Sequence, residues 1–391
     1  MQAFSFATPT RLIFGSGSLS ALGKERLPGV KCLLLTSRGR SVERTGVLAR
    51  VIEALDAAGV AHVHMPIVEP NPLVTTVMTG AECAKREGCD FVLGLGGGSV
   101  MDCAKAVALS ATNPGDFWDY IQQGQGGRKL VLVEPLPIVA VTTTAGTGSE
   151  VDGGGVITNP GTQEKCGFGG HAGLFPKLAV VDPELTLTVP PALTAYQGFD
   201  ALFHAVEGYL TKRPNALSDM YALEAVRHIS CGLARAVREG SDLEAREHVS
   251  MANTLSGYVM ACCRLTSQHS IEHALSAFHQ ELPHGAGLIM LSIAYFSHMI
   301  KTGARTERFV ELARAMGVRD AVHPEDFLRA LHELEAACGV ADLAMSDWGV
   351  TREEIPALAE KARSAGSALF EQDPVALTFE DTVSILEASF R

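Results

Sequence analysis

The first half of the chain alternates short apolar runs with helical patterns, and this alternation restricts its fold more than any other feature. The runs that look like strands lie at residues 31–36, 61–64, 91–95, 138–141 and 178–181. Two of them, 91–95 and 138–141, are apolar throughout, as expected of strands buried on both faces. Strands that alternate with helices are typical of a parallel sheet with covering helices. We therefore predict an α/β domain built on a parallel sheet.

The pattern of apolar and polar residues changes after Pro190 and Pro191. Beyond this pair the strand-like runs disappear, and amphipathic segments rich in Ala, Leu, Glu and Arg continue to the C-terminus. A proline pair ends the preceding β-type segment and can open a helix at its first turn. A length of 391 residues also exceeds what one core usually supports. We predict an α/β nucleotide-binding domain at 1–188 and an all-helical domain at 189–391.

Composition excludes several classes of function. The formal net charge of -12 argues against nucleic acid as a partner, because phosphate backbones are held by clustered Lys and Arg. Nine scattered cysteines, none in a CxxC pair, suggest neither a disulfide framework nor a thiolate zinc site. The N-terminus lacks the pattern of a signal peptide, and no run of about 18 apolar residues occurs. We expect a cytoplasmic protein with a small-molecule substrate and no membrane partner.

A glycine-rich segment at residues 94–98 follows a predicted buried strand and leads into a helix. Residues without side chains let a phosphate approach the backbone, and the N-terminus of the next helix favours its negative charge. Ser99, Asp102 and Lys105 recur every three residues, so polar groups stay beside the loop. The pattern is not GxGxxG, and a tight strand-to-helix turn without a ligand is the alternative interpretation.

A second small, hydroxyl-rich turn at residues 142–149 favours the ligand-binding interpretation. It also follows an apolar strand, and its sequence is TTTAGTGS. Ligands of open parallel sheets bind at the carboxyl ends of the strands, so both turns should border one crevice.

The helical half contains a group of histidines with one carboxylate. Asp200 and His204 are four residues apart and share a helix face, His269 and His273 repeat this spacing, and His284 lies at a turn bounded by proline and glycine. Imidazole nitrogens with one carboxylate oxygen suit a divalent ion such as Fe²⁺ or Zn²⁺. The residual positive charge of such a site would lower the cost of deprotonating an alcohol. Each histidine alone is more simply an ordinary polar residue of a helix.

Together these motifs resemble the iron-containing (group III) alcohol dehydrogenases, relatives of glycerol dehydrogenase and dehydroquinate synthase. The match runs from residues 11–15 to near the C-terminus, and its specific parts are GGGSVMDCAK at 96–105, TTTAGTGSEV at 142–151 and GFDALFHAVEGY at 198–209, followed by the histidines. The resemblance implies a dehydroquinate synthase-like fold, with an N-terminal dinucleotide-binding domain and an all-α metal-binding domain. It also implies a homodimer or larger homo-oligomer.

The resemblance assigns roles to the candidate site residues. It implies that Asp200, His204, His269 and His284 bind a divalent metal, with Fe²⁺ as the first candidate and Zn²⁺ as the second. His273 would sit near the nicotinamide and relay a proton, a task that an ordinary histidine pKa near 6.5 suits. The expected contacts with the dinucleotide are Ser37, Gly96, Gly97, Gly98, Ser99, Asp102, Thr143, Thr144, Thr147 and Lys165.

Two departures from the family pattern stand out. Members that prefer NAD usually carry an acidic residue after the first strand, where this chain has Ser-Arg-Gly-Arg at 37–40. An arginine would attract a 2'-phosphate, so we predict NAD(P) as cofactor with a preference for NADP. Residues 152–155, Asp-Gly-Gly-Gly, are also richer in glycine than the usual continuation of the threonine turn.

The sequence therefore predicts a metal-dependent, NAD(P)-linked alcohol dehydrogenase or aldehyde reductase for a small primary alcohol or aldehyde. A polyol (glycerol-like) dehydrogenase and a maleylacetate-type reductase are alternatives on the same fold. A non-catalytic nucleotide- or metal-binding protein is the alternative from another class.

Overall fold

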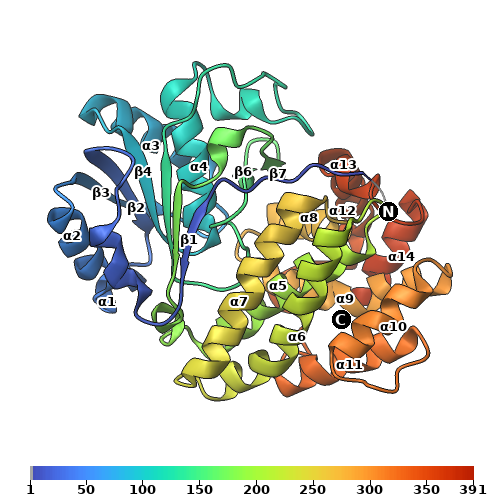
Figure 1. The fold of residues 1–391 in the computed structure, drawn as a ribbon. Coiled ribbons are helices and arrows are strands. Elements are labelled where there is room, and N and C mark those ends of the chain that lie inside the picture. Colours follow the sequence, from blue (N-terminus) through green and yellow to red (C-terminus); the bar gives the residue numbers. More distant parts are fainter. Residues whose placement is uncertain (1–2) are drawn as a thin grey trace.

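The first half of the chain folds around a six-stranded parallel sheet in the order β1-β8-β5-β4-β2-β3 (Figure 1). The computed structural model describes residues 3–391. The strands of this sheet are β1 (Arg11–Phe14), β2 (Lys31–Ser37), β3 (Ala61–Val68), β4 (Phe91–Gly96), β5 (Ile138–Thr142) and β8 (Leu178–Val181). The predicted parallel sheet is confirmed, and each strand-like run of the sequence belongs to it.

Helices cover both faces of this sheet. Successive side chains of β2 point to opposite faces, so Leu33 and Leu35 join a core with α4 (Gly98–Thr112), while Cys32 and Leu34 join another with α2 (Val47–Ala57). The remaining elements of this half are α1 (Ser41–Arg44), α3 (Val74–Glu87) and the 3-10 turns at 18–24, 117–120, 172–174 and 183–186. Burial of both faces explains why the central strands are apolar throughout.

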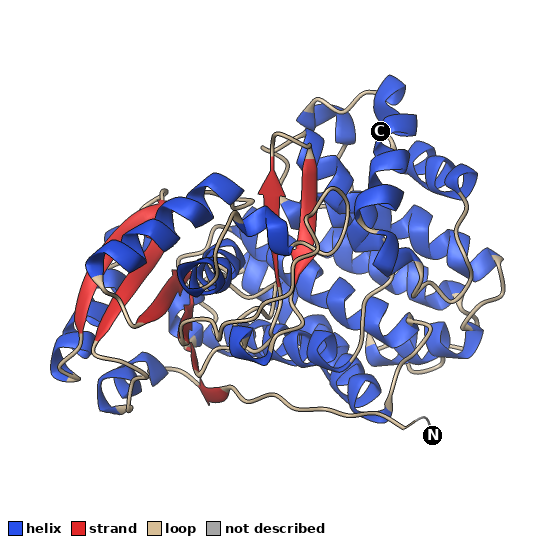
Figure 2. Ribbon diagram, turned by 90° about the horizontal axis from the view of Figure 1, so that it is seen from above, coloured by secondary structure: helices blue, strands red, loops and turns tan. Residues whose placement is uncertain are grey.

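A two-stranded antiparallel hairpin, β6 (Gly155–Asn159) and β7 (Glu164–Phe168), was not predicted from the sequence. It stands apart from the main sheet, between that sheet and the helices (Figure 2). Both strands are short, and three of the residues of β7 are charged or glycine. The sequence therefore lacks the alternation of apolar and polar residues that would indicate a strand. Strand β7 packs against α8 (Gln268–Phe278) and α12 (Ile355–Ala365), which places its side chains near the helical half.

The second half is helical, as predicted, and it is organised around α5 (Pro191–Leu210). Every residue of α5 from Gly198 to Leu210 is buried, so this helix is surrounded by others. The other helices are α6 (Ala216–Arg238), α7 (Leu243–Cys262), α9 (His284–Lys301), α10 (Thr306–Ala315), α11 (Glu325–Ala337), α13 (Ser367–Phe370) and α14 (Phe379–Ser389). The predicted domain boundary near residue 188 falls between the last sheet strand and α5. Across residues 3–391, none of the helices combines the length and the apolar character needed to cross a membrane.

Helix α5 packs closely on α7 through Gly208. A Cβ added to this glycine would lie 2.2 Å from Val259 Cγ1. We predict that Gly208→Ala lowers the free energy of unfolding by about 1–3 kcal/mol, because overpacking outweighs the gain in helix propensity. Thermal or urea unfolding of the variant measures the change.

Gly167→Ala serves as the control, because the nearest atom to its added Cβ would be 3.9 Å away. An unchanged midpoint for both variants would show that the contact between α5 and α7 is not tight.

Candidate active site

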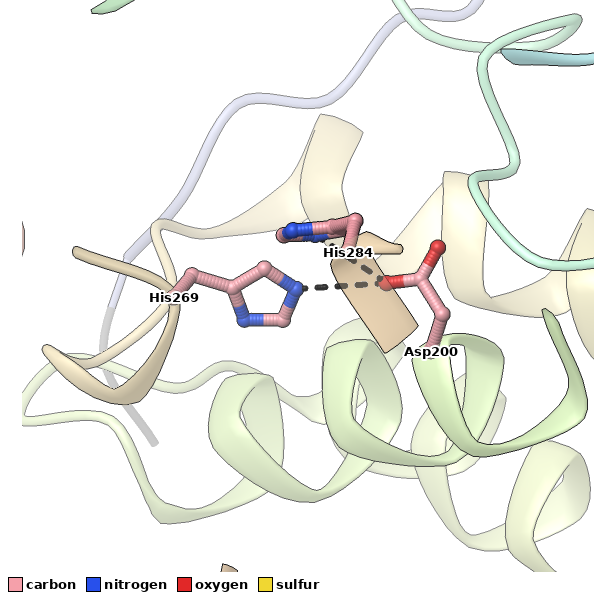
Figure 3. A group of neighbouring side chains, drawn as sticks. All are labelled: Asp200, His269 and His284. Carbon is pink, nitrogen blue, oxygen red and sulfur yellow. Dashed lines mark hydrogen bonds and ion pairs between the residues drawn. The ribbon is translucent and has the colours of Figure 1, made fainter. Parts of the chain in front are cut away.

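Three imidazole nitrogens surround one carboxylate oxygen on the central helix. Asp200 Oδ1 lies 3.3 Å from His204 Nδ1, 3.4 Å from His269 Nε2 and 3.5 Å from His284 Nε2. Figure 3 shows the rings of His269 and His284 on one side of the Asp200 carboxylate, each joined to one of its oxygens by a dashed line. All four side chains that the sequence suggested as metal ligands therefore meet at one place.

Three helices position these groups. Asp200 and His204 are one turn apart on α5, and His269 lies in the first turn of α8. His284 was expected in a turn, but it is the first residue of α9, with Pro283 immediately before it at the N-cap. Asp200, His204 and His269 are all buried, so water does not compete freely for their polar atoms.

The donor set fits a divalent metal ion. Ligand atoms at about 2.1 Å from one ion, in tetrahedral directions, lie about 3.4 Å from each other, as Asp200 Oδ1 does from the three nitrogens. Among the described residues, the buried His204 Nδ1 has no hydrogen-bond partner. Such an orphaned nitrogen is costly unless something binds it. Ligand atoms of Asp200, His269 and His284 all lie within 4.8 Å of one another, whereas His204 approaches this group through its contact with Asp200.

Two buried carboxylates, which the sequence motifs did not indicate, lie behind the histidines. His269 Nδ1 donates to Glu207 Oε1, and His284 Nδ1 donates to Glu272 Oε2. Both carboxylates are inaccessible to solvent. Hydrogen bonds of this kind orient a metal-ligating histidine and make it a stronger donor. The only sequence signal was position, since Glu207 lies three residues after His204 and Glu272 lies between His269 and His273.

The electrostatics of the cluster follow from burial and mutual charge. Burial alone would raise the pKa of Asp200, but His204, His284 and His269 outweigh it and lower that pKa. Burial lowers the pKa of His204 to about 3, against the opposing effect of Asp200. Burial also lowers the pKa of His269, but the charges and hydrogen bonds of Glu207 and Asp200 outweigh it and raise this pKa to about 10. The cluster thus favours positive charge at its centre, and a metal ion would have to displace a proton from His269.

His273 lies one helical turn after His269, beside the cluster. Its ring centroid is 6.3 Å from that of His269 and 5.4 Å from that of His284. Burial, and then the charge of Lys165, lowers the pKa of His273 well below 6.5. The pKa of His273 is thus below the ordinary histidine value, mainly because of burial and secondly because of a lysine on the unpredicted hairpin. A neutral imidazole at this position can accept a proton.

The two predicted cofactor turns touch each other. Strands β4 and β5 are neighbours, and Thr143 N donates to Gly96 O at 2.9 Å. A Cβ on Gly97 would lie 2.8 Å from Thr144 Cγ2, and one on Gly98 would lie 2.3 Å from Thr147 Cγ2. Glycine at 97 and 98 is thus required by the close approach of the threonine turn. Ser99 lies next to Gly98 in the first turn of α4, at the positive end of that helix.

The threonine turn also reaches the histidine cluster. Ala145 N donates to Gln197 Oε1 at 3.2 Å, and a Cβ on Gly146 would lie 3.2 Å from Asp200 Oδ2. The turn therefore links the α4 N-terminus, where a phosphate is expected, to the carboxylate of the histidine cluster. This is the arrangement that a crevice at the carboxyl ends of the strands requires.

Asp102 and Lys105 hold the stretch around residues 152–155, the Asp-Gly-Gly-Gly sequence that departs from the family pattern. Asp102 accepts from Ser149 Oγ at 2.6 Å and from Val156 N at 2.8 Å. Lys105 Nζ is fully buried and pairs with Asp152 Oδ1 at 2.5 Å. Burial raises the pKa of Asp102 to about 6, against the charge of Lys105. Asp152 is therefore the counterion of a buried lysine, and a Cβ on Gly153 would lie 2.4 Å from Phe175 Cε2, so both residues have a structural reason.

The last two candidate cofactor residues lie in different places. Ser37 ends β2, at the same sheet edge as Gly96, and the following Arg38 pairs with Glu69 at 3.2 Å. Lys165 lies away from this edge, with Nζ 2.9 Å from Ser276 Oγ and 3.3 Å from His284 Nδ1. The side chain of Lys165 thus lies at the histidine cluster and not beside the glycine-rich segment.

Comparison with known families gives a match over nearly the whole chain. The model of the iron-containing alcohol dehydrogenases matches residues 9–183, and that of the C-terminal domain of the Fe-containing alcohol dehydrogenase family matches residues 194–390. The chain is 36% identical to 1,3-propanediol dehydrogenase of Citrobacter freundii over 376 residues, which cover 94% of each chain. It is 35% identical to a probable NADH-dependent butanol dehydrogenase of Bacillus subtilis, with 100% of both chains covered.

Solved structures agree with these matches. An archaeal halo-thermophilic alcohol dehydrogenase from a Red Sea brine pool superimposes with a TM-score of 0.94 at 34% identity, over 100% of both chains. The NADH-dependent butanol dehydrogenase A of Thermotoga maritima superimposes with a TM-score of 0.89 at 30% identity, over 100% of this chain and 99% of that one. The chain therefore belongs to the iron-containing alcohol dehydrogenase family, whose members are oxidoreductases acting on CH–OH groups.

Proposed function

We propose that this protein is a metal-dependent, NAD(P)-linked alcohol dehydrogenase that also works as an aldehyde reductase on small primary alcohols and aldehydes. The observation that carries the proposal is the meeting of three imidazole nitrogens at Asp200 Oδ1, next to the turn that faces the α4 N-terminus. A non-catalytic nucleotide- or metal-binding protein would need only one of these two features.

Asp200, His204, His269 and His284 would hold the metal, and the charges around them favour a divalent ion. The carboxylates of Asp200, Glu207 and Glu272 contact the histidines, and Lys165 is the ammonium group paired with one of them. Three negative charges and one positive charge leave about two negative charges, which one divalent cation balances. Imidazole and carboxylate donors suit both Fe²⁺ and Zn²⁺, and membership of the iron-containing family makes Fe²⁺ the first candidate and Zn²⁺ the second. When bound, the metal supplies a Lewis acid for the substrate oxygen, and the nicotinamide exchanges the hydride.

Other residues of the chain would bind the cofactor and transfer the proton. The backbone N–H groups of Gly98 and Ser99, at the start of α4, would bind the pyrophosphate. Thr144 and Thr147 close the other side of that turn. His273, neutral and half-buried at the edge of the cluster, would take the proton released by an alcohol or return it to the product of aldehyde reduction.

The relatives indicate the substrate only as a broad class, small alcohols and aldehydes. Similarity to 1,3-propanediol dehydrogenase favours short diols as a second candidate, which agrees with the polyol alternative. The four complete ligand positions disfavour a metal-free reductase of the maleylacetate type.

We also propose a cytoplasmic homodimer or larger homo-oligomer. All nine cysteines are free, which fits a reducing compartment, and light scattering measures the oligomeric state.

The metal assignment predicts the behaviour of Asp200→Asn. The amide keeps the shape of the side chain but removes its charge, so we expect loss of bound metal and at least a hundredfold lower turnover. Elemental analysis of protein purified without oxygen, with oxidation of NAD(P)H by short aldehydes, measures both. Chelation of the unmodified enzyme should give the same loss, and restored metal should reverse it. Full activity in stripped protein would contradict the assignment.

His273→Ala should separate proton transfer from metal binding. We expect turnover to fall by about 10²–10⁴-fold, the usual contribution of general acid–base catalysis, while metal content stays at the level of the unmodified enzyme. Steady-state kinetics and elemental analysis of one preparation test this. Loss of the metal in this variant would make His273 a ligand instead.

The cofactor preference depends on the residues after β2. Arg40 is well exposed and 3.8 Å from Glu43, whereas Arg38 is already held by Glu69. We predict a higher kcat/KM with NADP than with NAD, because the exposed guanidinium of Arg40 attracts the 2'-phosphate. Arg40→Ala should lower kcat/KM for NADP about tenfold and leave that for NAD unchanged. A tenfold preference of the unmodified enzyme for NAD would overturn this prediction.

A further inference from the structure

Glu272 is a fully buried carboxylate that is neither a proposed metal ligand nor a proposed proton carrier. It lies on α8 between His269 and His273, and it contacts the side chains of two other elements. Its Oε2 accepts from Nδ1 of His284 on α9 and lies 3.5 Å from Nζ of Lys165 on β7. A buried carboxylate costs several kcal/mol unless it is paired and hydrogen-bonded, so its position needs a reason.

One possible reason is a second metal site. Glu272, His273 and His284 each offer a ligand atom, and these atoms lie within 4.8 Å of one another. The ammonium group of Lys165 already lies in this group, 3.3 Å from His284 Nδ1 and 2.9 Å from Ser276 Oγ. Lys165 thus supplies the positive charge that a second cation would bring. The cluster is therefore built for one ion.

The geometry of His284 points to a different role. Its Nε2 faces Asp200 at 3.5 Å, and its Nδ1 faces Glu272. A hydrogen bond from Nδ1–H fixes the tautomer, leaves the Nε2 lone pair free for a metal and holds the ring in one orientation. Glu207 does the same for His269 on the other side of the cluster. Two of the three histidines thus have a carboxylate behind them.

We propose that Glu272 is a positioning residue, which together with Lys165 holds Nε2 of His284 toward the metal and so strengthens metal binding. Lys165 keeps Glu272 paired inside the protein, and the hairpin β6–β7 delivers that lysine. The inference rests on the proposed metal function of Asp200, His204, His269 and His284.

The test uses Zn²⁺ and the metal-stripped full-length protein, in competition with a chromophoric chelator. Removing a carboxylate behind a metal-ligating histidine lowers metal affinity by about 10–100-fold, and we expect Glu272→Gln to raise the Kd for Zn²⁺ by this factor. Glu335→Gln is the matched control, because Glu335 is also buried but bonds Ser292 Oγ at 2.8 Å and touches no histidine of the cluster. Its Kd should equal that of the unmodified protein.

A double variant separates positioning from general stability. Glu272→Gln alone leaves Lys165 buried without its partner, so the metal-free protein should also melt at a lower temperature. Lys165→Met with Glu272→Gln removes both charges and should recover most of the melting temperature while the Kd for Zn²⁺ stays raised.

The outcomes are distinct. An unchanged Kd in Glu272→Gln, or full recovery of affinity in the double variant, would overturn the positioning role, since Glu272 would then serve only to neutralise Lys165. Should Glu272→Gln fail to fold, the double variant alone decides between these outcomes. Failure of the unmodified protein to bind one Zn²⁺ would instead contradict the proposed function itself.

Discussion

The structure depends on how α5 holds Asp200 inside the helical half. A buried carboxylate without compensation would destabilise the fold, and here three imidazole nitrogens within 3.5 Å provide the compensation. Because α5 is buried on all sides from Gly198 to Leu210, its side chains meet α8 and α9 with little freedom to move. Helix packing thus fixes the positions of the four side chains, which is what a metal site needs.

The same helix connects the two halves of the molecule. The threonine turn after β5 lies against α5 at Gln197 and Asp200, and its other side lies against Gly97 and Gly98 at the start of α4. Residues 142–149 therefore touch both the proposed phosphate site and the proposed metal site. A dinucleotide bound at α4 would extend toward the histidines along this turn, which explains why small residues and threonines occur there.

The sequence predicted the features that depend on local spacing. Apolar runs indicated the strands, the four-residue spacing placed Asp200 and His204 on one face, and the motifs identified the family. It missed contacts made across long stretches of chain. Glu207 pairs with His269 across 62 residues, and Lys165 reaches His284 across 119. No local pattern encodes such contacts, because they arise only when separate elements pack. The lowered pKa of His273 was missed for the same reason.

The proposed metal centre is one divalent ion held by Asp200, His204, His269 and His284. Anomalous X-ray diffraction from a crystal of the iron-loaded protein, collected on both sides of the iron absorption edge, tests it most directly. We predict a single peak within about 2.0–2.2 Å of Asp200 Oδ1 and of one nitrogen from each histidine. A peak elsewhere, or none at this cluster in a crystal that contains iron, would contradict the account.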